Sequence, residues 1–301
     1  MDYYVSKNHN TLNKRKFSPE LIGTRVCLSP LYNVELGRPV DVLLDSGAFQ
    51  DTRQETRVSF QEALDRQLAF EMSVGFSSRF LVSYDWMVDE ASGDGRNKHK
   101  QRVSYSKSEK CVDQTISAAK YLADQRRDLT PRRLVLSSQG ITAPQYLRCV
   151  REILSFAQPE DVLGLGGFCI IGQVPSLKKQ YYKVLEGVLP LMRKRGLRRL
   201  HLFGIGTFGA LVRTHMLCRN AGIRPSYDTS SYEFNSVMGK VFQPDFAHIG
   251  PDGPRMIAAL VKRDKYRLYH PRDWAHFNIG MINHFWSELE KRYPIKGDRR
   301  D

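Results

Sequence analysis

Three aspartates stand directly after short apolar runs that lie far apart in the chain. Asp45 follows VLL, Asp85 follows FLVSY and Asp228 follows RPSY. Short apolar runs of this kind are typical of buried strands, and parallel strands with helical crossovers collect their ligand groups at the carboxyl ends of the strands. We therefore expect the three carboxylates to share one pocket.

Each aspartate taken singly has a structural alternative, because a carboxylate can cap a helix or pair with one of the many arginines. The recurrence of an aspartate at the ends of several predicted strands favours a common pocket. Such a set suits a glycoside-type or base-exchange reaction. One carboxylate can attack an anomeric carbon, while a second carboxyl group moves protons on the departing group.

The elements that must position these acids follow an alternating pattern of short apolar runs and helical spacings. Strands are predicted at 25–28, 42–44, 80–84, 134–137, 162–165, 200–203 and 225–227, and helices at 59–75, 108–127, 143–156, 180–195, 208–221 and 274–291. Residues 257–261 are predicted as part of a further helix. The alternation predicts the α/β class and a single TIM-type (β/α)8 barrel, regular or irregular, with a C-terminal helix.

Composition sets the domain organisation and the class of partner. The 301 residues fit one barrel domain at 20–295, preceded by a basic arm at 1–19 and followed by a frayed tail at 296–301. Lys and Arg outnumber Asp and Glu by 46 to 32, and a net charge of +14 favours a polyanion such as nucleic acid. A merely soluble basic surface is the alternative.

Other features exclude several classes of function. The five cysteines are odd in number and widely spaced, which predicts reduced thiols and no metal site. The basic, polar start of the chain and the lack of a membrane-length apolar stretch predict a cytoplasmic protein without membrane contact. The turns GLGG and GIGTFG match no complete phosphate-binding signature, so no nucleotide cofactor is predicted.

Glycines and aromatic residues at the strand ends suit a flat ligand. Bare backbone at Gly166 and Gly167 can approach a nucleobase closely, and Phe49 and Phe203 can stack on its two faces. Core packing is the alternative for both rings.

Basic segments offer contacts to a phosphate backbone. The loop at 91–102 carries the predicted nucleic-acid-binding residues Arg96, Lys98, Lys100 and Arg102, with a solvated surface loop as the alternative. Two further basic segments lie at 194–199 and 262–267. The first of them falls between a helix and the next strand, which is the end of a barrel opposite to the expected site.

Six segments together resemble the tRNA-guanine transglycosylase superfamily. DSGAFQ at 45–50 is similar to the family's DSGGFQ-type signature, and SYD at 226–228 stands where the family has its nucleophilic aspartate. The other similar segments, in the family's order, are VSYD at 82–85, SQG at 138–140, LGGF at 165–168 and LFGIGT at 202–207. The resemblance covers residues 40 to 230, and its specificity comes from the ordered set.

This resemblance implies a barrel that exchanges guanine for a 7-deazaguanine base by double displacement, without a redox or nucleotide cofactor. Asp228 would attack C1′ of the nucleoside, and Asp45 would move the proton of the leaving and entering base. The implied substrate-binding residues are Asp85 and Gln139 at the base edge, Gly166 and Gly167 through their backbone, Phe49 and Phe203 as a sandwich, and Ser46.

Two departures from the tRNA enzymes bear on the substrate. Their zinc site needs a C-x-C-x-x-C run, and no cysteine follows Asp228 in this chain, which excludes that zinc site. The segment Thr229-Ser230-Ser231 and the lack of an accessory RNA-binding domain make the chain similar to the DNA 7-deazaguanine transglycosylases, including phage-encoded ones. We therefore expect DNA as the acceptor, with guanine flipped out of the stack.

Three alternatives remain open at this point. The acceptor can be tRNA instead of DNA. The chain can be a non-catalytic nucleic-acid-binding paralogue, although its three acids argue against this. It can also be an unrelated barrel hydrolase that acts on a small phosphorylated sugar.

Overall fold

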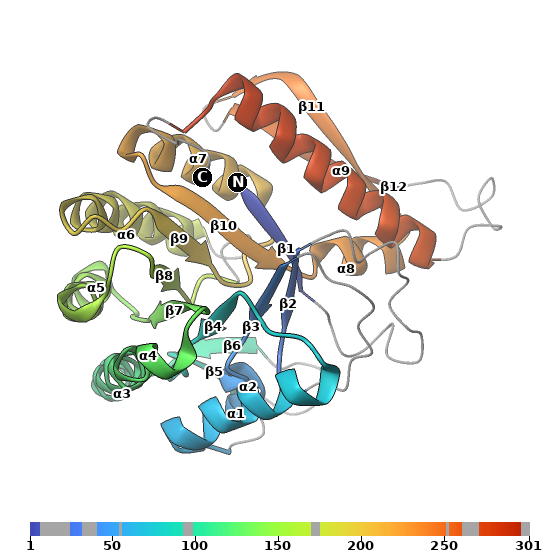
Figure 1. Ribbon diagram of the computed structural model, residues 1–301. Helices are drawn as coiled ribbons and strands as arrows, with labels where there is room; N and C mark the ends of the chain where they lie inside the picture. Colours follow the sequence, from blue (N-terminus) through green and yellow to red (C-terminus); the bar gives the residue numbers. More distant parts are fainter. Residues whose placement is uncertain are drawn as a thin grey trace.

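Eight parallel strands of the computed structural model close into a barrel (Figure 1). The structure describes residues 1–6, 25–31, 41–53, 56–92, 99–169, 175–250, 253–260 and 271–295. The barrel strands, in chain order, are β1 (Asp2–Ser6), β2 (Arg25–Leu28), β3 (Asp41–Leu44), β4 (Phe80–Val82), β7 (Arg133–Ser138), β8 (Val162–Leu165), β9 (Arg199–Leu202) and β10 (Arg224–Thr229). Each strand pairs with its neighbours in this order, and β10 pairs with β1 to close the barrel. This confirms the predicted TIM-type fold.

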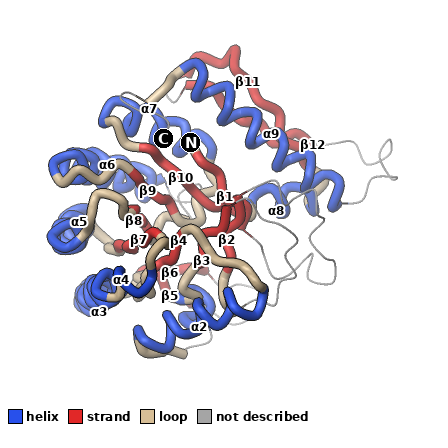
Figure 2. The backbone as a smooth tube through the Cα atoms, viewed as in Figure 1, coloured by secondary structure: helices blue, strands red, loops and turns tan. Residues whose placement is uncertain are grey.

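Helices surround the strands on the outside of the barrel (Figure 2). They are α1 (Ala48–Arg53), α2 (Phe60–Val74), α3 (Tyr105–Asp124), α4 (Arg126–Leu129), α5 (Ala143–Phe156), α6 (Pro175–Lys194), α7 (Phe208–Ala221), α8 (Ser231–Val237) and α9 (Pro271–Arg292). The C-terminal helix α9 packs against α8 and β1. Among the described helices, none has both the length and the apolar character that a membrane span requires.

Local sequence explains where helix α2 begins and ends. The Ser59 hydroxyl accepts a hydrogen bond from the backbone N–H of Glu62 at 3.1 Å, which satisfies one of the free donors of the first turn. Gly75 ends the helix in the left-handed conformation with φ of 71°, where a residue without Cβ is favoured. Both ends of this helix were predicted correctly from the sequence.

Two antiparallel hairpins extend from the barrel. The pair β5 (Asp89–Ser92) and β6 (His99–Arg102) occupies part of the predicted loop at 91–102. The pair β11 (Lys240–Gly250) and β12 (Gly253–Leu260) includes residues 257–260. The predicted helix at 257–261 is therefore wrong over the described residues, because pairing with β11 satisfies the backbone of this segment as a strand.

The predicted basic arm at 1–19 is wrong at its beginning. Residues 2–6 form β1, which lies between β2 and β10, and its central residues Tyr3, Tyr4 and Val5 are all buried. Aromatic and β-branched side chains favour a strand even in so short a segment. Residues 7–19 and the predicted tail at 296–301 lie outside the described residues.

The strands divide the core into an inner and an outer layer, because successive side chains point to opposite faces. The inner cluster fills the barrel and contains Tyr4, Cys27, Leu43, Phe80, Val82, Val135 and Val162. The outer cluster packs the strands against the helices; on β10, for example, Tyr227 stacks on Tyr3 with 5.1 Å between ring centroids. Asp228, one position further along β10, therefore points into the barrel.

Candidate active site

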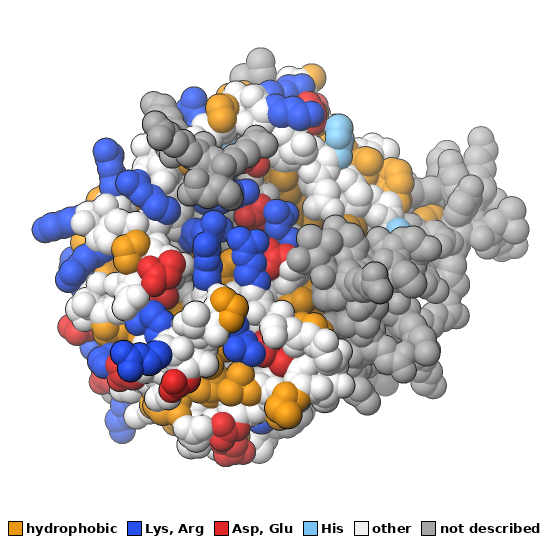
Figure 3. Space-filling view, in the orientation of Figure 1, with side chains coloured by type: hydrophobic (Ala, Val, Ile, Leu, Met, Phe, Trp, Pro, Cys, Tyr) orange, Lys and Arg blue, Asp and Glu red, His pale blue; other side chains and the backbone are white. Residues whose placement is uncertain are grey.

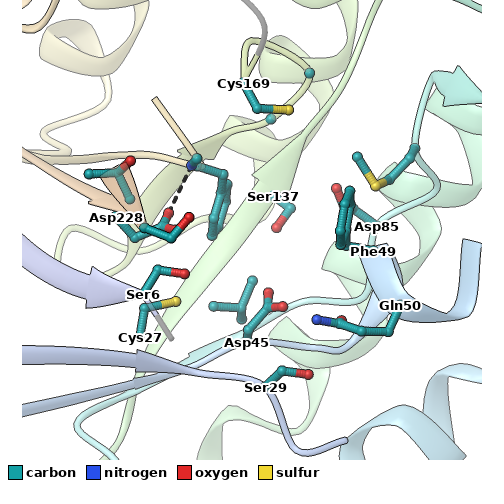
Figure 4. A pocket seen from close by; sticks show the side chains of 18 of the residues that line it. Ser6, Cys27, Ser29, Asp45, Phe49, Gln50, Asp85, Ser137, Cys169 and Asp228 are labelled. Atoms are coloured by element: carbon teal, nitrogen blue, oxygen red, sulfur yellow. Dashed lines mark hydrogen bonds between the residues drawn. The ribbon is translucent and has the colours of Figure 1, made fainter. Parts of the chain in front are cut away.

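A cavity of about 350 Å³ opens at the carboxyl ends of the barrel strands. Figure 4 shows Asp45, Asp85 and Asp228 around this cavity, on three different sides. Asp45 directly follows β3, Asp85 follows β4, and Asp228 lies within β10. The structure thus brings together the three acids that the sequence placed in one pocket.

The carboxylate of Asp228 is held through one of its two oxygens. Its Oδ1 accepts a hydrogen bond from the backbone N–H of Gly204 at 3.0 Å and lies 3.3 Å from Nε2 of His201. Nδ1 of His201 lies 2.9 Å from the hydroxyl oxygen of Ser226, and that hydroxyl donates to the carbonyl oxygen of Leu200 at 3.2 Å. Within the described residues Oδ2 has no hydrogen-bond partner. It is the oxygen available to attack an electrophile.

The carboxyl group of Asp45 is poised to exchange a proton near neutral pH. Burial raises the pKa of Asp45 to about 7, and the negative charges of Asp85 and Asp228 act in the same direction. Hydrogen bonds from the backbone at Ser46 and Gly47 oppose this shift. Both protonation states are therefore present at neutral pH, as general acid–base catalysis requires.

Gln67 fixes the two strand ends that carry Asp45 and Asp85. Its amide nitrogen lies within hydrogen-bond distance of the carbonyl oxygens of Leu44 at 3.0 Å, Asp45 at 3.1 Å and Val82 at 3.0 Å, so its two hydrogens are shared among three acceptors. Because Gln67 is buried in α2, this helix ties together the ends of β3 and β4.

A second polar pair faces the cavity at Asp85 and Gln139. The amide nitrogen of Gln139 donates a hydrogen bond to Oδ2 of Asp85. Burial raises the pKa of Asp85, while the bond from Gln139 lowers it in part. Oε1 of Gln139 is buried without a hydrogen-bond partner in the described part of the chain. A buried acceptor of this kind usually meets a ligand or a water molecule.

Glycine is required beside Gln139 because there is no room for a Cβ atom. A Cβ at Gly166 would lie 2.2 Å from Nε2 of Gln139, and one at Gly167 would lie 3.0 Å from Oε1. Gly167 also has a φ of 75°, a conformation that residues with a Cβ rarely adopt. The hydroxyl of buried Tyr146 donates to the carbonyl oxygen of Gly166 and fixes this turn.

The two predicted stacking residues line the cavity in different ways. Phe49, on α1, stands beside Asp85 at the wall of the cavity (Figure 4). Phe203 follows β9 and packs on the inner cluster, with its ring 4.6 Å from the ring of His201. A Cβ at Gly164 would lie 2.6 Å from the Phe203 ring, so this glycine makes room for it. Phe203 therefore serves both core packing and the cavity.

Some predicted residues are not brought to the cavity or are not described. Ser46 is buried outside the cavity lining, and its hydroxyl accepts from the N–H of Ala48 at 3.3 Å. Arg96 and Lys98 lie outside the described residues. Lys100 and Arg102 belong to strand β6, of which the structure describes the backbone alone.

Several residues of the site were missed by sequence reasoning. His201 has the clearest signal in retrospect, because it lies two positions before Phe203 and so faces the same side of β9. Ser6 was missed together with its strand β1. The other cavity residues that were not predicted are Cys27, Ser29, Gln50, Val82, Met87, Ser137, Gly204, Thr229 and Ser230.

Comparisons of the sequence with protein-family models and with curated proteins found no match. The described residues contain no group of three or more His, Cys, Asp or Glu side chains that could hold a metal ion. The cavity itself presents carboxylates, amides and glycine turns.

Proposed function

We propose that this chain is a DNA-guanine transglycosylase, which exchanges guanine in DNA for a 7-deazaguanine base. The observation that carries this proposal is the convergence of three carboxylates with different surroundings in one cavity. Asp228 has one oxygen fixed and one available, and Asp45 titrates near neutral pH. The ordered motifs shared with the tRNA-guanine transglycosylase superfamily give the same residues the same roles.

The first half of the reaction breaks the bond between C1′ and N9 of a deoxyguanosine in the DNA. Oδ2 of Asp228 attacks C1′ and forms a covalent ester, and the electron pair of the C1′–N9 bond leaves with guanine. Protonated Asp45 gives its proton to the departing base, because a neutral leaving group is expelled more easily than an anion.

The second half reverses these steps with a different base. Asp45, now a carboxylate, takes the N9 proton of the incoming 7-deazaguanine, and N9 attacks C1′. The ester bond to Asp228 breaks and its carboxylate is restored. Two inversions at C1′ leave the β-configuration unchanged. At the end of the reaction Asp45 is protonated again and Asp228 is again a carboxylate.

The base-binding part of the cavity suits a guanine-like edge. Asp85 and Gln139 present acceptor oxygens to ring and exocyclic N–H groups, while the backbone at Gly166 and Gly167 can approach the opposite edge. A volume of about 350 Å³ falls within the range of small-ligand pockets. A base of this size must leave the duplex stack before it can enter.

The overall charge supports a nucleic-acid acceptor. A net charge of +14 attracts the phosphate backbone and predicts binding that weakens as salt concentration rises. We propose DNA because the segment after Asp228 is similar to the DNA-modifying branch, and we keep tRNA as the alternative acceptor. Mass spectrometry of nucleosides from the DNA and the tRNA of cells that express the chain separates the two.

The direct test is the substitution Asp228→Asn. The amide is a poor nucleophile, so we expect release of labelled guanine from DNA to fall by at least ~10³-fold, while DNA binding is retained. Asp65→Asn is a matched control, because Asp65 is exposed on α2 and far from the cavity lining. Full exchange by Asp228→Asn would remove Asp228 from the nucleophile role. A wild-type chain that binds DNA but exchanges no base would favour the non-catalytic paralogue.

A further inference from the structure

A second charged cluster occupies the amino-terminal end of the barrel, opposite to the cavity. Five arginines lie at or next to the starts of their strands: Arg25, Arg79, Arg133, Arg199 and Arg224. We call this set the arginine ring. In Figure 3, Lys and Arg side chains gather around the middle of the barrel, with acidic side chains between them.

The alternation of side chains along each strand directs most of the ring toward the barrel axis. Arg224 lies two and four positions before Ser226 and Asp228, and Arg199 lies two positions before His201. Arg133 precedes the inner residue Val135 by two positions. Arg199 and Arg224 are also register partners on adjacent strands, and both line a small cavity at this end.

Among the described residues, two aspartates pair with three of the five arginines of the ring. Asp2 pairs with Arg25 at 3.3 Å and with Arg224 at 3.2 Å, and Asp41 pairs with Arg79 at 3.0 Å.

Within the described residues, Arg133 and Arg199 have no ion-pair partner. Five arginines and two aspartates leave a net charge of +3. Burial lowers the pKa of Arg199, and repulsion from Arg133, Arg224 and Arg79 lowers it further.

We propose that the arginine ring binds a compact phosphate anion at the amino-terminal mouth of the barrel. A guanidinium group offers paired N–H donors that match two phosphate oxygens. Several guanidinium groups around one axis therefore match an anion with several oxygens. Arg133 and Arg199 are only partly exposed, which favours a compact anion over a continuous nucleic-acid backbone. The inference does not depend on the proposed base exchange, because it concerns the other end of the barrel.

Isothermal titration with sodium pyrophosphate at constant ionic strength tests this site on the full chain. We expect the wild-type chain to bind pyrophosphate and the double variant Arg133→Gln/Arg199→Gln to bind it at least ~10-fold more weakly. The matched control is Arg193→Gln/Arg195→Gln, which removes the same charge from exposed positions at the end of α6. It should change the affinity by less than ~2-fold.

A third variant, Arg199→Lys, keeps the positive charge and removes the paired N–H donors of the guanidinium group. We expect it to bind with intermediate affinity, because lysine contacts a phosphate as a point charge. This variant and far-UV circular dichroism keep the test valid should the double variant fail to fold.

Three results would overturn the proposal. The first is a wild-type chain that gives no more heat with pyrophosphate than with a matched chloride titration. The second is a control variant that loses as much affinity as the double variant. The third is a ring that binds a duplex oligonucleotide but not pyrophosphate. The last result would assign the ring to nucleic acid.

Discussion

The two ends of the barrel differ in the charges they gather, and one inward-facing column of side chains, on β10, joins them. On β10 the column begins with Arg224 and ends with Asp228. At the carboxyl end the acids surround an open cavity, and their mutual repulsion helps to raise the pKa of Asp45. At the amino end aspartates pair with three of the five arginines. Both ends therefore hold like charges close together, and the acidic end surrounds the larger of the two cavities described above.

The largest effect that would sharpen this comparison is loss of Asp45, the acid that we propose transfers the proton. We expect Asp45→Asn to reduce base exchange by roughly 10²–10⁴-fold, the usual contribution of general acid–base catalysis. In the wild-type chain kcat/KM for DNA should fall as pH rises above about 7, because the acid form of Asp45 starts the reaction. Rate profiles from pH 5 to 9 measure both effects. A variant that keeps the inflection near pH 7 would show that another group titrates there.

The same substitution should stabilise the fold, with a defined dependence on pH. The pKa of Asp45 is raised from 3.8 to about 7, so ionisation of this group favours the unfolded chain. The resulting destabilisation grows between about pH 4 and pH 7 and is then constant, with an upper limit of about 4 kcal/mol.

Urea unfolding should therefore show Asp45→Asn to be more stable than the wild type, by a larger margin at pH 8 than at pH 5. Asp65→Asn, at an exposed position, should show no such trend. A margin that shrinks as pH rises would contradict the assigned direction of the shift.

A smaller effect is expected from Gly166→Ala, which changes the packing of the acidic end without changing its charge. The new Cβ would displace Gln139, whose amide nitrogen lies 2.2 Å from that position, and would break its bond to Asp85. Loss of one such bond costs about 1–3 kcal/mol, so we expect KM for the base to rise by roughly 10–100-fold. Gly280→Ala is the control, because nothing lies within 4 Å of its Cβ position. Equal kinetics in the two variants would exclude a role for Gln139.

The smallest effect is expected at the opposite end of the barrel. Arg199→Gln removes a charge that lies near Arg133, Arg224 and Arg79 and has no ion-pair partner in the described residues. We expect the free energy of unfolding in chloride buffer to rise by about 0.5–1 kcal/mol, without the pH dependence of Asp45→Asn. Chemical denaturation at pH 5 and pH 8 measures it. Destabilisation at both pH values would show that the Arg199 side chain contributes more through packing than it costs in repulsion.

Strong local signals made much of the fold predictable. The predicted helices at 59–75 and 143–156 agree with α2 and α5, whose ends are marked in the sequence by Ser59, Gly75 and Thr142. Strand β1 was missed because its apolar core of three residues precedes a long polar stretch. Strand β12 was mistaken for a helix because its apolar run carries no clear alternation, and pairing with β11 decides its conformation.

The candidate site was predictable as far as it depends on strand ends. Asp45, Asp85 and Asp228 follow apolar runs, and parallel strands bring such positions together. Ser46 shows the limit of that reasoning, because a hydroxyl in a turn can bond to a nearby N–H and leave the ligand side. The contact between His201 and Asp228 joins two strands, and no spacing along the chain reveals it.

The pairing of β1 with β10 joins two segments that lie more than two hundred residues apart in the chain. Until β10 emerges, β1 has an edge without its partner, and the Tyr3 ring lacks the Tyr227 ring against which it stacks. Contacts so distant in sequence slow folding, and an open strand edge invites pairing with other chains. Asp228, near the end of β10, thus reaches the cavity only when the sheet closes on itself, so that a chain without this pairing lacks one of the three acids of the cavity.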